Sequence, residues 1–390
     1  MKRPVLMLSA AHPPDDIRIV AKEGAALAAA GHRVMHLAPG TPPARMLHGV
    51  ELRSAGPKPR GWAARIGGVL RLARHAAALK PSVIHAHEPD SWLAARLAAW
   101  RCGARVVLDV HEHYPSRLDQ RLPRLLRPAA RLLLGGACRL LSLGADAVVV
   151  AKDGLDGAFG GPARCTPVRN YAADPGLKPR RHAPGPLRLL HLGALGRERG
   201  AFTMLEILQR VPDASLLLVG RFTDGSEDAF DARARALALD DRIVKLGWLP
   251  RDAALAEAAK ADIALVLFQP GIENHRLALP HKLFDAMLCG LPVIVPDFAT
   301  EVASVVAEAG CGVAVDTAST EAVAPAIGAL TDPATRDAMG LRGRAAALTR
   351  FGWEAEARRL TALYERLLPA DPPRLARPGF EPTRAASGGD

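Results

Sequence analysis

Several residue types are scarce in this chain of 390 residues, and each scarcity excludes a class of protein. The five cysteines are scattered without a close pair, so we expect neither a disulfide framework nor a zinc site. Aromatic residues make up only 4% of the chain and alternate with no basic run, so we expect no nucleic-acid partner. No apolar run approaches the roughly 20 residues that span a bilayer. Since no signal-peptide core follows Met1 either, we expect a cytoplasmic protein.

The abundant residues are apolar and basic. Hydrophobic residues make up 49% of the chain, which is ample for two cores, and the length fits two domains of moderate size. The net charge of +11 comes mainly from arginine. It favours an anionic partner, such as a nucleotide phosphate or an acidic phospholipid.

The first half of the chain alternates short apolar strands with helical patterns. We expect strands at residues 5–9, 33–38, 83–87, 105–110 and 147–150, and helices at residues 17–30, 62–79 and 91–101. Strands separated by helices indicate a parallel sheet with right-handed crossovers. Ligands bind such sheets beyond the carboxyl ends of the strands. This rule selects residues 9–16, 85–90 and 111–114 and the loop after Val150.

A second series of strands and helices follows a stretch rich in proline, glycine and basic residues. We therefore predict an α/β fold of two Rossmann-like, doubly wound domains that face an interdomain cleft. The predicted division is an N-terminal domain (1–175), a linker (176–186), a C-terminal domain (187–350), a final helix packing back toward the N-terminal domain (351–369) and a disordered tail (370–390).

The chain is organised around residues 277–297, which read LALPHKLFDAMLCGLPVIVPD. Pro280 suits the first position of a helix, and Gly290 lies where that helix ends, before a short apolar strand. The free N–H groups of the first turn and Lys282 then form an anion site, with Asp285 in reach of a sugar hydroxyl. The same residues also fit a buried α/β unit with a solvated lysine, and both interpretations stay open at this point.

Several segments in order carry a family resemblance. They are DIRIVAKEGAALAAAGHRV, HAHEPD, LDVHEHYP, VRNYAADP, GWLPRDAALAEAAKADIALVLF and ALPHKLFDAMLCGLPVI. They resemble the blocks of the family-4 glycosyltransferases, which have the GT-B fold, and the last segment is similar to the bacterial polysaccharide-biosynthesis type. The resemblance covers residues 5–368.

The resemblance implies transfer of a glycosyl group from a nucleotide-diphosphate sugar, with retention at the anomeric carbon. It places the donor on the C-terminal domain and a saccharide or lipid-linked acceptor on the N-terminal domain. It further implies that Asp285 binds the nucleotide ribose. Lys282 and the helix entry at Pro280 and His281 lie beside the donor phosphates.

Other matched positions complete the implied site. Arg199 falls where the family has a basic residue that neutralises the diphosphate, and Gly193 belongs to the loop below it. His111 falls at the histidine that faces the transferred sugar, and Glu112 follows it as an acceptor contact or a cap. Fixed cations suit this chemistry because breaking the glycosyl–phosphate bond builds negative charge on the leaving group.

Two positions depart from the family pattern. Leu277 stands where a first carboxylate is expected, so Glu273 or Asn274 supplies a polar contact instead, or the sugar is held differently. Ala194 stands where an arginine is expected, and Arg197 is the candidate to compensate for it.

We expect no metal and no cofactor besides the donor. The adjacent Asp15 and Asp16 form no Asp-x-Asp pair and lie on the wrong side of the fold for the donor. His85 and His87 have a spacing that metal ligands can have. We interpret them as facing opposite sides of a strand and hence as structural or acceptor-side residues.

Residues 117–139, from Arg117 to Arg139, carry arginines at helical spacing with leucines between them. Such a face suits an anionic membrane surface, which makes the protein peripheral at the inner face of a membrane. An ordinary packed helix with a solvated arginine face is the alternative, and the arginine-rich composition leaves both open.

The preferred function is thus a metal-independent, retaining glycosyltransferase of cell-surface polysaccharide or glycolipid assembly. One alternative is a nucleotide-sugar epimerase on the same fold, which would rearrange the donor without an acceptor. The other is a noncatalytic glycosyltransferase-like partner subunit, for which Leu277 and Ala194 are the main support.

Overall fold

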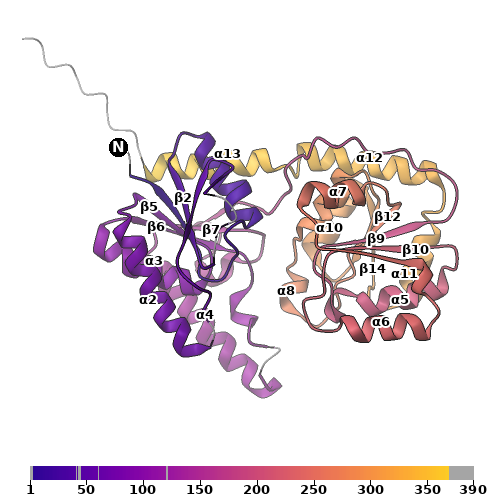
Figure 1. The fold of residues 1–390 in the computed structure, drawn as a ribbon, viewed down its shortest axis with the longest axis horizontal. Coiled ribbons are helices and arrows are strands. Elements are labelled where there is room, and N and C mark those ends of the chain that lie inside the picture. Colours follow the sequence, from indigo (N-terminus) through magenta and orange to yellow (C-terminus); the bar gives the residue numbers. More distant parts are fainter. Residues whose placement is uncertain (1–2, 41, 43–44, 60, 120–121, 369–390) are drawn as a thin grey trace, which may run out of the picture.

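The computed structural model describes residues 3–40, 42, 45–59, 61–119 and 122–368. The expected disordered tail at 370–390 lies outside this range. Figure 1 shows two α/β bodies side by side. We call them the N-terminal lobe (residues 3–170 with the last helix) and the C-terminal lobe (residues 187–349). Each is a doubly wound, largely parallel sheet, so the fold class predicted from the sequence is confirmed.

The N-terminal lobe contains an eight-stranded sheet in the order β3-β4-β2-β1-β5-β6-β7-β8, parallel except for the β3–β4 pair. The strands are β1 (Val5–Leu8), β2 (Val34–Ala38), β3 (Met46–Leu47), β4 (Val50–Ser54), β5 (Val83–Ala86), β6 (Arg105–Val110), β7 (Ala147–Val150) and β8 (Cys165–Pro167). The strand order reverses at β1, so a crevice opens beyond the carboxyl ends of β1 and β5.

The C-terminal lobe contains a six-stranded, entirely parallel sheet in the order β11-β10-β9-β12-β13-β14. The strands are β9 (Arg188–Leu192), β10 (Ser215–Val219), β11 (Ile243–Gly247), β12 (Ile263–Leu265), β13 (Val293–Pro296) and β14 (Gly312–Val315). Here the order reverses at β9, which places the second crevice beyond β9 and β12.

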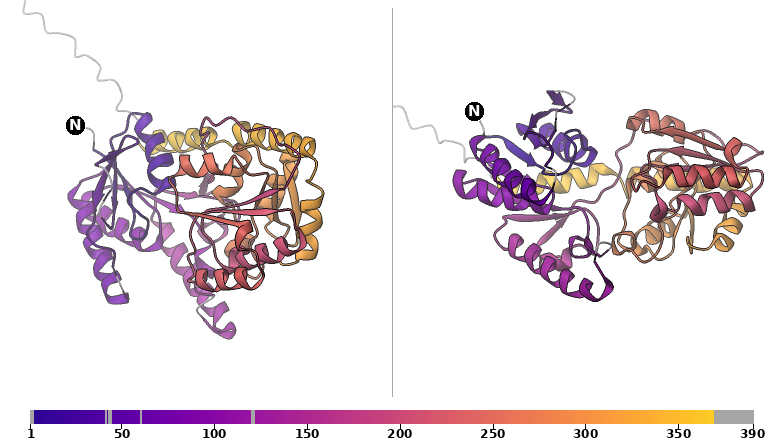
Figure 2. Two further views of the ribbon diagram at one scale, coloured as in Figure 1. Left: turned by 45° about the vertical axis from the view of Figure 1, so that its right-hand side comes forward. Right: turned by 60° about the horizontal axis from the view of Figure 1, so that its bottom comes forward.

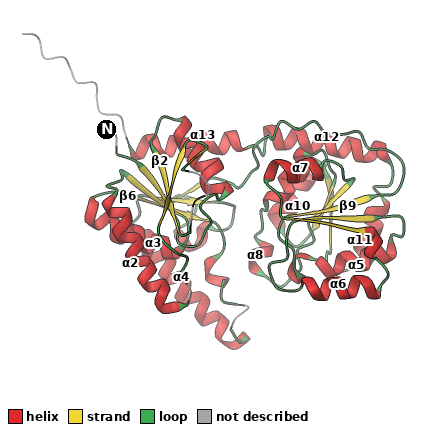
Figure 3. Cartoon of the chain, in the orientation of Figure 1, coloured by secondary structure: helices red, strands yellow, loops and turns green. Residues whose placement is uncertain are grey.

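Helices cover both faces of each sheet (Figure 3). On the N-terminal sheet, one face carries α2 (Trp62–Ala78), α3 (Pro89–Cys102) and α4 (Arg127–Leu143), and the other carries η1 (Ile17–Gly24), α1 (Ala25–Ala29) and α13 (Trp353–Leu367). On the C-terminal sheet, one face carries α7 (Arg251–Ala258), α9 (His281–Leu288), α10 (Thr300–Ala309) and α12 (Pro333–Thr349), and the other carries α5 (Ala201–Arg210), α6 (Glu227–Ala236) and α11 (Thr320–Gly328). Helix α8 (Glu273–Arg276) and the short helices η2 (Tyr114–Ser116), η3 (Arg124–Leu126), η4 (Asp156–Phe159), η5 (Arg197–Arg199) and η6 (Asp240–Arg242) lie in connections.

This double coverage explains the composition of the strands. Every residue of β1, β5 and β13 is buried, because a strand with helices on both faces has no solvated side. The last helix, α13, buries Leu360 and Tyr364 against the N-terminal sheet although the preceding helix belongs to the C-terminal lobe. The chain therefore crosses back between the lobes at its end (Figures 1 and 2).

The predicted single helix over residues 17–30 is wrong in its geometry. The structure has a π-helix over Ile17–Gly24 followed by the short α1. The wider winding accommodates three charged side chains in the interior, those of Arg18, Lys22 and Glu23, all of which are buried. A 3.6-residue hydrophobic pattern does not reveal such a change of winding.

Candidate functional site

A cavity of about 580 Å³ lies between the two lobes, at the carboxyl ends of their strands. Its N-terminal wall consists of His111, Glu112, Ser116, Arg117, Asp119, Arg127, Ala151, Lys152 and Asn170. Its C-terminal wall consists of Glu198, Arg199, Phe268, Gly271, Ile272, Glu273, Asn274, His275, Ala278, Leu279 and Pro280. The predicted interdomain cleft is therefore present, and the strand-end rule locates it correctly on both lobes.

Two glycines lie close together where β9 and β10 end. Gly193 has φ +91°, and its N–H donates to the carbonyl of Val219 at 2.7 Å. A Cβ atom on Gly220 would lie 1.8 Å from the carbonyl oxygen of Gly193, so no larger residue fits there. The Lys282 side chain passes 3.8 Å from the Cβ position of Gly193, which leaves a narrow approach to the backbone at this loop.

Arg199 lines this wall, and Lys282 lies beside Gly193 in the loop that follows β9. The Lys282 ammonium lies 2.9 Å from Nε2 of His191 and 5.8 Å from the centre of the Phe268 ring. Burial and the charge of Arg199 lower the pKa of Lys282 well below its usual range, and burial and Lys282 do the same for His191. The Arg199 guanidinium donates a hydrogen bond to the hydroxyl of Thr223, at 3.4 Å. Neither cation forms an ion pair with a carboxylate among the described residues, so an anionic ligand would stabilise both.

Helix α9 begins at the cavity. Pro280 is its N-cap, with φ −81° and ψ 143°, so our placement of this proline at the first helical position is wrong by one residue. The backbone of Pro280 is extended, so the helix itself begins at His281. Gly290 has φ +73° just after the helix, which confirms the predicted glycine stop.

His281 and Asp285 lie on the side of α9 that faces away from the cavity lining. Nδ1 of His281 lies 3.1 Å from the ammonium of Lys22, which comes from the N-terminal lobe. The Asp285 carboxylate accepts a hydrogen bond from Arg251 at 2.8 Å, and burial raises its pKa although Arg251 opposes this. Both residues, which were predicted to contact the sugar donor, are therefore already bonded to other side chains of the protein, His281 to Lys22 and Asp285 to Arg251.

The structure shows what surrounds Leu277, which stands in place of the expected carboxylate, and what its predicted substitutes contact. Leu277 packs against the N-terminal lobe, 3.2 Å from the Cβ position of Gly154, so the missing carboxylate is replaced by an apolar contact between lobes. Glu273 lines the cavity and pairs with Arg276, and the Asn274 amide oxygen accepts from the His113 N–H at 2.8 Å across the lobes.

Arg197 does not line the cavity. Its guanidinium lies over the Phe202 ring, 4.1 Å from the ring centre, and its backbone N–H donates to Asp224. To compensate for the arginine that Ala194 replaces, the Arg197 side chain would have to move away from the Phe202 ring and into the cavity.

On the opposite wall, His111 is held by a buried carboxylate. Its Nε2 lies 2.7 Å from Oδ2 of Asp109, and since a carboxylate only accepts, Nε2 carries the hydrogen. Burial alone would raise the pKa of Asp109, but the Arg18 guanidinium and the hydrogen bonds from His111 and His87 hold it well below its usual range. Glu112 lines the same wall and pairs with Arg117 at 3.2 Å.

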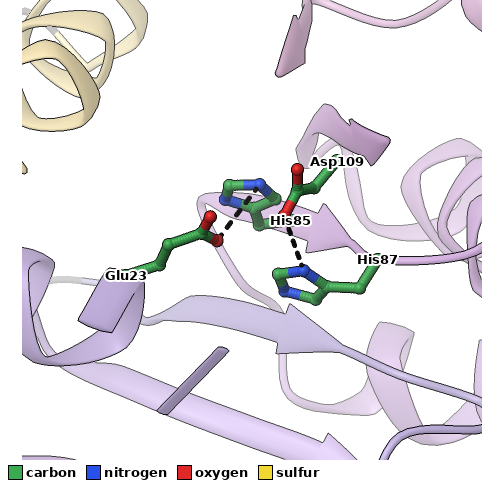
Figure 4. Close-up of side chains that lie close together, drawn as sticks. All are labelled: Glu23, His85, His87 and Asp109. Atoms are coloured by element: carbon green, nitrogen blue, oxygen red, sulfur yellow. Dashed lines mark hydrogen bonds and ion pairs between the residues drawn. The ribbon is translucent and has the colours of Figure 1, made fainter. Parts of the chain in front are cut away.

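Behind His111 lies a buried cluster of Glu23, His85, His87 and Asp109 (Figure 4). Their potential ligand atoms all lie within 4.8 Å of one another. Arg18 already bridges both carboxylates, with Nη2 at 2.8 Å from Glu23 and 2.9 Å from Asp109. A metal ion would have to displace this guanidinium, so we interpret the cluster as a compensated structural network.

The prediction that His85 and His87 face opposite sides is wrong. Their rings stack with centres 4.9 Å apart, and both reach the same buried cluster. The reason is the two-residue repeat of a strand, which places residues i and i+2 on one face.

The lining residues to which sequence reasoning assigned no role include Lys152, Asn170, Phe268 and His275. The ring of His275 stacks on Phe268 at 4.6 Å between centres, and its Nδ1 lies 3.1 Å from the carbonyl of Gln269. The strand-end rule selects the loop after β7, where Lys152 lies. No sequence pattern indicates that its side chain turns inward.

The helix α4 and the short helix η3 before it present an exposed apolar surface outside the cavity. Its members, which we call the α4 leucine surface, are Leu125, Leu126, Leu132, Leu133, Leu140 and Leu143. Leu132 is 78% exposed and Leu133 is 74% exposed. The neighbouring Arg117 and Arg131 pair with Glu112 and Asp119. Among the described residues no helix has both the length and the apolar character needed to cross a bilayer.

Comparison with known proteins gives a consistent result. Residues 18–170 match the model of the glycosyl transferase 4-like domain, and residues 177–346 match that of the glycosyl transferases group 1. No curated protein matches the chain.

Three solved structures illustrate the shared fold. Sucrose-phosphate synthase from Thermosynechococcus elongatus has a TM-score of 0.78 at 19% identity, over 94% of this chain and 99% of that one. HepE from Anabaena, in complex with UDP, has a TM-score of 0.70 at 16% identity, over 93% and 100%. The lipopolysaccharide outer core galactosyltransferase WaaB has a TM-score of 0.61 at 12% identity, over 93% and 99%.

Proposed function

Because the chain belongs to the group 1 glycosyltransferases of family 4, we propose that it moves a sugar from a nucleoside-diphosphate sugar to a saccharide or lipid-linked acceptor, with retention at the anomeric carbon. The acceptor belongs to cell-surface polysaccharide or glycolipid assembly. One relative in fold, WaaB, is a galactosyltransferase of the lipopolysaccharide outer core, and this supports the assignment.

One observation carries the proposal: Arg199 and Lys282, which have no carboxylate partner among the described residues, lie on one side of the cavity, and a carboxylate-bound histidine lies on the other. Arg199 lines it and Lys282 lies against the same strand-end loop, beside the N-terminus of α9. A diphosphate placed there would receive two cations and the free N–H groups of the first turn. His111 then faces the sugar from the N-terminal wall, with Asp109 holding its ring.

The proposed reaction needs no base from the protein. The bond between the anomeric carbon and the β-phosphate oxygen breaks, and the acceptor hydroxyl oxygen bonds to the anomeric carbon on the same face. The hydroxyl proton passes to the departing β-phosphate, and the nucleoside diphosphate leaves. Arg199 and Lys282 stabilise the charge that builds on the phosphates, which is the largest expected contribution of the protein.

A nucleotide-sugar screen tests this function. HepE is described in complex with UDP and with UDP-glucose, so UDP-sugars are the first donors to assay, followed by ADP- and GDP-sugars. We expect slow hydrolysis of one donor to the sugar and the nucleoside diphosphate, with the α-anomer released first from an α-linked donor. Arg199→Ala should lower this rate at least tenfold. A rearranged sugar nucleotide formed without an acceptor would instead indicate an epimerase, and no consumption of any donor would contradict turnover.

We also propose that the α4 leucine surface docks on an anionic membrane. Six exposed leucines lie on and just before one amphipathic helix, and Arg124 and Arg139 are exposed beside them. Apolar side chains that enter the acyl boundary and arginines that bind acidic headgroups together define a peripheral membrane surface. A lipid-linked acceptor would then meet the cavity from the membrane side.

Vesicle sedimentation tests the docking. The protein should sediment with vesicles containing phosphatidylglycerol and not with pure phosphatidylcholine. The double substitution Leu132→Ser and Leu133→Ser should remove most of the binding. Leu341→Ser is the control, because Leu341 is 66% exposed on the C-terminal lobe and lies outside the proposed surface. Equal binding by both variants would contradict the proposal.

A further inference from the structure

The cavity contains a lysine that the proposed donor site does not use. Lys152 follows β7 on the N-terminal wall and is only 7% exposed. Its ammonium group makes no hydrogen bond or ion pair to the residues that the structure describes. The carboxylates whose field reaches it, those of Glu112 and Glu301, are both engaged elsewhere, Glu112 with Arg117 and Glu301 with the Asp153 N–H.

Asn170 adds a second unused polar group beside Lys152. Its backbone N–H donates to the carbonyl of Ala151 at 3.0 Å, so residues 151–152 and 170 lie next to each other on the same wall. Its side-chain Oδ1 is buried without a hydrogen-bond partner among the described groups, although the side chain lines the cavity. The amide can be turned to present its NH₂ group instead, because the two orientations are nearly isosteric.

Unmade hydrogen bonds at two adjacent, buried positions are costly. A buried polar group without a hydrogen-bond partner is destabilised because it has lost its bonds to water, and a charged group is destabilised more. Burial lowers the pKa of Lys152 to about 8, against the attraction of Glu112 and Glu301. A ligand that restores these bonds must accept hydrogen bonds and carry negative charge. An oxyanion, either a phosphate or a carboxylate, has both properties.

We propose that Lys152 and Asn170 form a subsite on the N-terminal wall that binds an oxyanion of the acceptor, a phosphate or a carboxylate. This proposal rests on the proposed transferase function, because that function places the acceptor on this wall. The donor diphosphate is a separate ligand, since Arg199, Lys282 and the N-terminus of α9 lie on the other lobe. The acceptor class is therefore an anionic saccharide or a phosphate-linked one, and a neutral sugar would leave the subsite unpaired.

Calorimetry on the full chain tests the subsite with two probes, inorganic phosphate and glucuronate. The donor site is first saturated with whichever of UDP, ADP or GDP binds, so that the probes report on a second site. We expect phosphate, glucuronate or both to bind. Lys152→Met should weaken this binding at least tenfold, Lys152→Arg should restore most of it, and Lys58→Met, an exposed control, should change nothing. The stronger probe indicates whether the acceptor group is a phosphate or a carboxylate.

The nucleotide affinity of Lys152→Met separates the subsite from the donor site. We expect it to stay within twofold of wild type. A parallel loss of nucleotide affinity would overturn the proposal by assigning Lys152 to the donor, and unchanged probe binding in Lys152→Met would overturn it directly.

A second readout does not depend on the nucleotide. Reductive methylation with ¹³C labels each lysine, and the Lys152 signal is the one missing from Lys152→Arg. This signal should titrate near pH 8 and move to higher pH when phosphate is added. If no nucleoside diphosphate binds the wild-type protein, the proposed function fails, while the Lys152 signal still reports on the anion subsite. If neither phosphate nor glucuronate changes the titration of the Lys152 signal, the subsite is contradicted, whether or not a nucleoside diphosphate binds.

Discussion

The charges behind His111 and the charges beside the start of α9 are arranged differently. In the N-terminal lobe, Arg18, Glu23 and Asp109 are all buried, and each has an opposite charge within about hydrogen-bond distance, 2.8 to 3.0 Å. In the C-terminal lobe, Arg199 lines the cavity and Lys282 lies beside the loop that follows β9, and neither has a carboxylate partner among the described residues. Compensated charge stabilises the fold and positions His111, whereas uncompensated positive charge stabilises a bound anion.

The largest effect is expected from a substitution in the network of Arg18, Glu23 and Asp109. Asp109→Asn leaves the Arg18 guanidinium buried with only Glu23 as counterion. We expect the free energy of unfolding to fall by about 3 to 5 kcal/mol, as for other broken buried pairs. Chemical denaturation measures it. Glu308→Gln, which removes a surface pair with Arg350, is the control and should change stability by less than about 1 kcal/mol. Equal losses in both variants would mean that the network is not compensated as described.

The second prediction concerns Lys282, a cation without a carboxylate partner among the described residues. Lys282→Met keeps the length of the side chain but discards an ammonium whose pKa is held well below its usual range. Stability should therefore stay equal or rise, while the affinity for a nucleoside diphosphate should fall about ten- to hundredfold, the value of a charge-assisted hydrogen bond. Denaturation and calorimetry measure the two effects. Lys260→Met, at an exposed position of the same lobe, should alter neither, and a marked loss of stability in Lys282→Met would contradict the comparison.

The smallest expected effect is a pH dependence of stability that comes from Glu301, which contacts Asp153 of the other lobe. Burial and the charge of Asp153 raise the pKa of Glu301 from 4.5 to about 7, although Arg169 and Lys152 oppose this. The folded protein then binds more protons than the unfolded chain between these values, so this group lowers stability as pH rises from about 4.5 to 7.

Glu301→Gln isolates this contribution, because the amide mimics the protonated acid. We expect equal free energies of unfolding at pH 4, and a variant more stable than wild type at pH 8. Parallel stability curves for the two proteins between pH 4 and pH 8 would rule out a raised pKa at Glu301.

Much of the fold was predictable because parallel strands carry a strong signal. The runs that form β1 and β13 are continuous apolar segments, and those that form β5, β6 and β9 are mainly apolar segments between helical patterns. The winding of η1 was not predictable, because its buried Arg18 and Lys22 bond to distant segments, which local periodicity does not reveal. The short edge strands β3 and β8 also lack a signal, because two or three residues give no pattern.

The candidate site was predictable in location more than in detail. The strand-end rule and the helix start at Pro280 indicate the cavity and its cationic wall. The side chains of His281, Asp285 and Arg197 were not predictable, because their directions depend on partners from distant segments, namely Lys22, Arg251 and Phe202. The inward turn of Lys152 also depends on tertiary context.

The central claim is that the C-terminal wall binds the donor nucleotide and the N-terminal wall binds the acceptor. One titration tests it most directly. Calorimetry compares nucleoside-diphosphate binding by the wild-type protein, Arg199→Ala and His111→Ala. We expect an affinity at least tenfold weaker in Arg199→Ala and within twofold of wild type in His111→Ala. Equal losses in both variants, or a loss in His111→Ala alone, would contradict the assignment of the donor to the C-terminal wall.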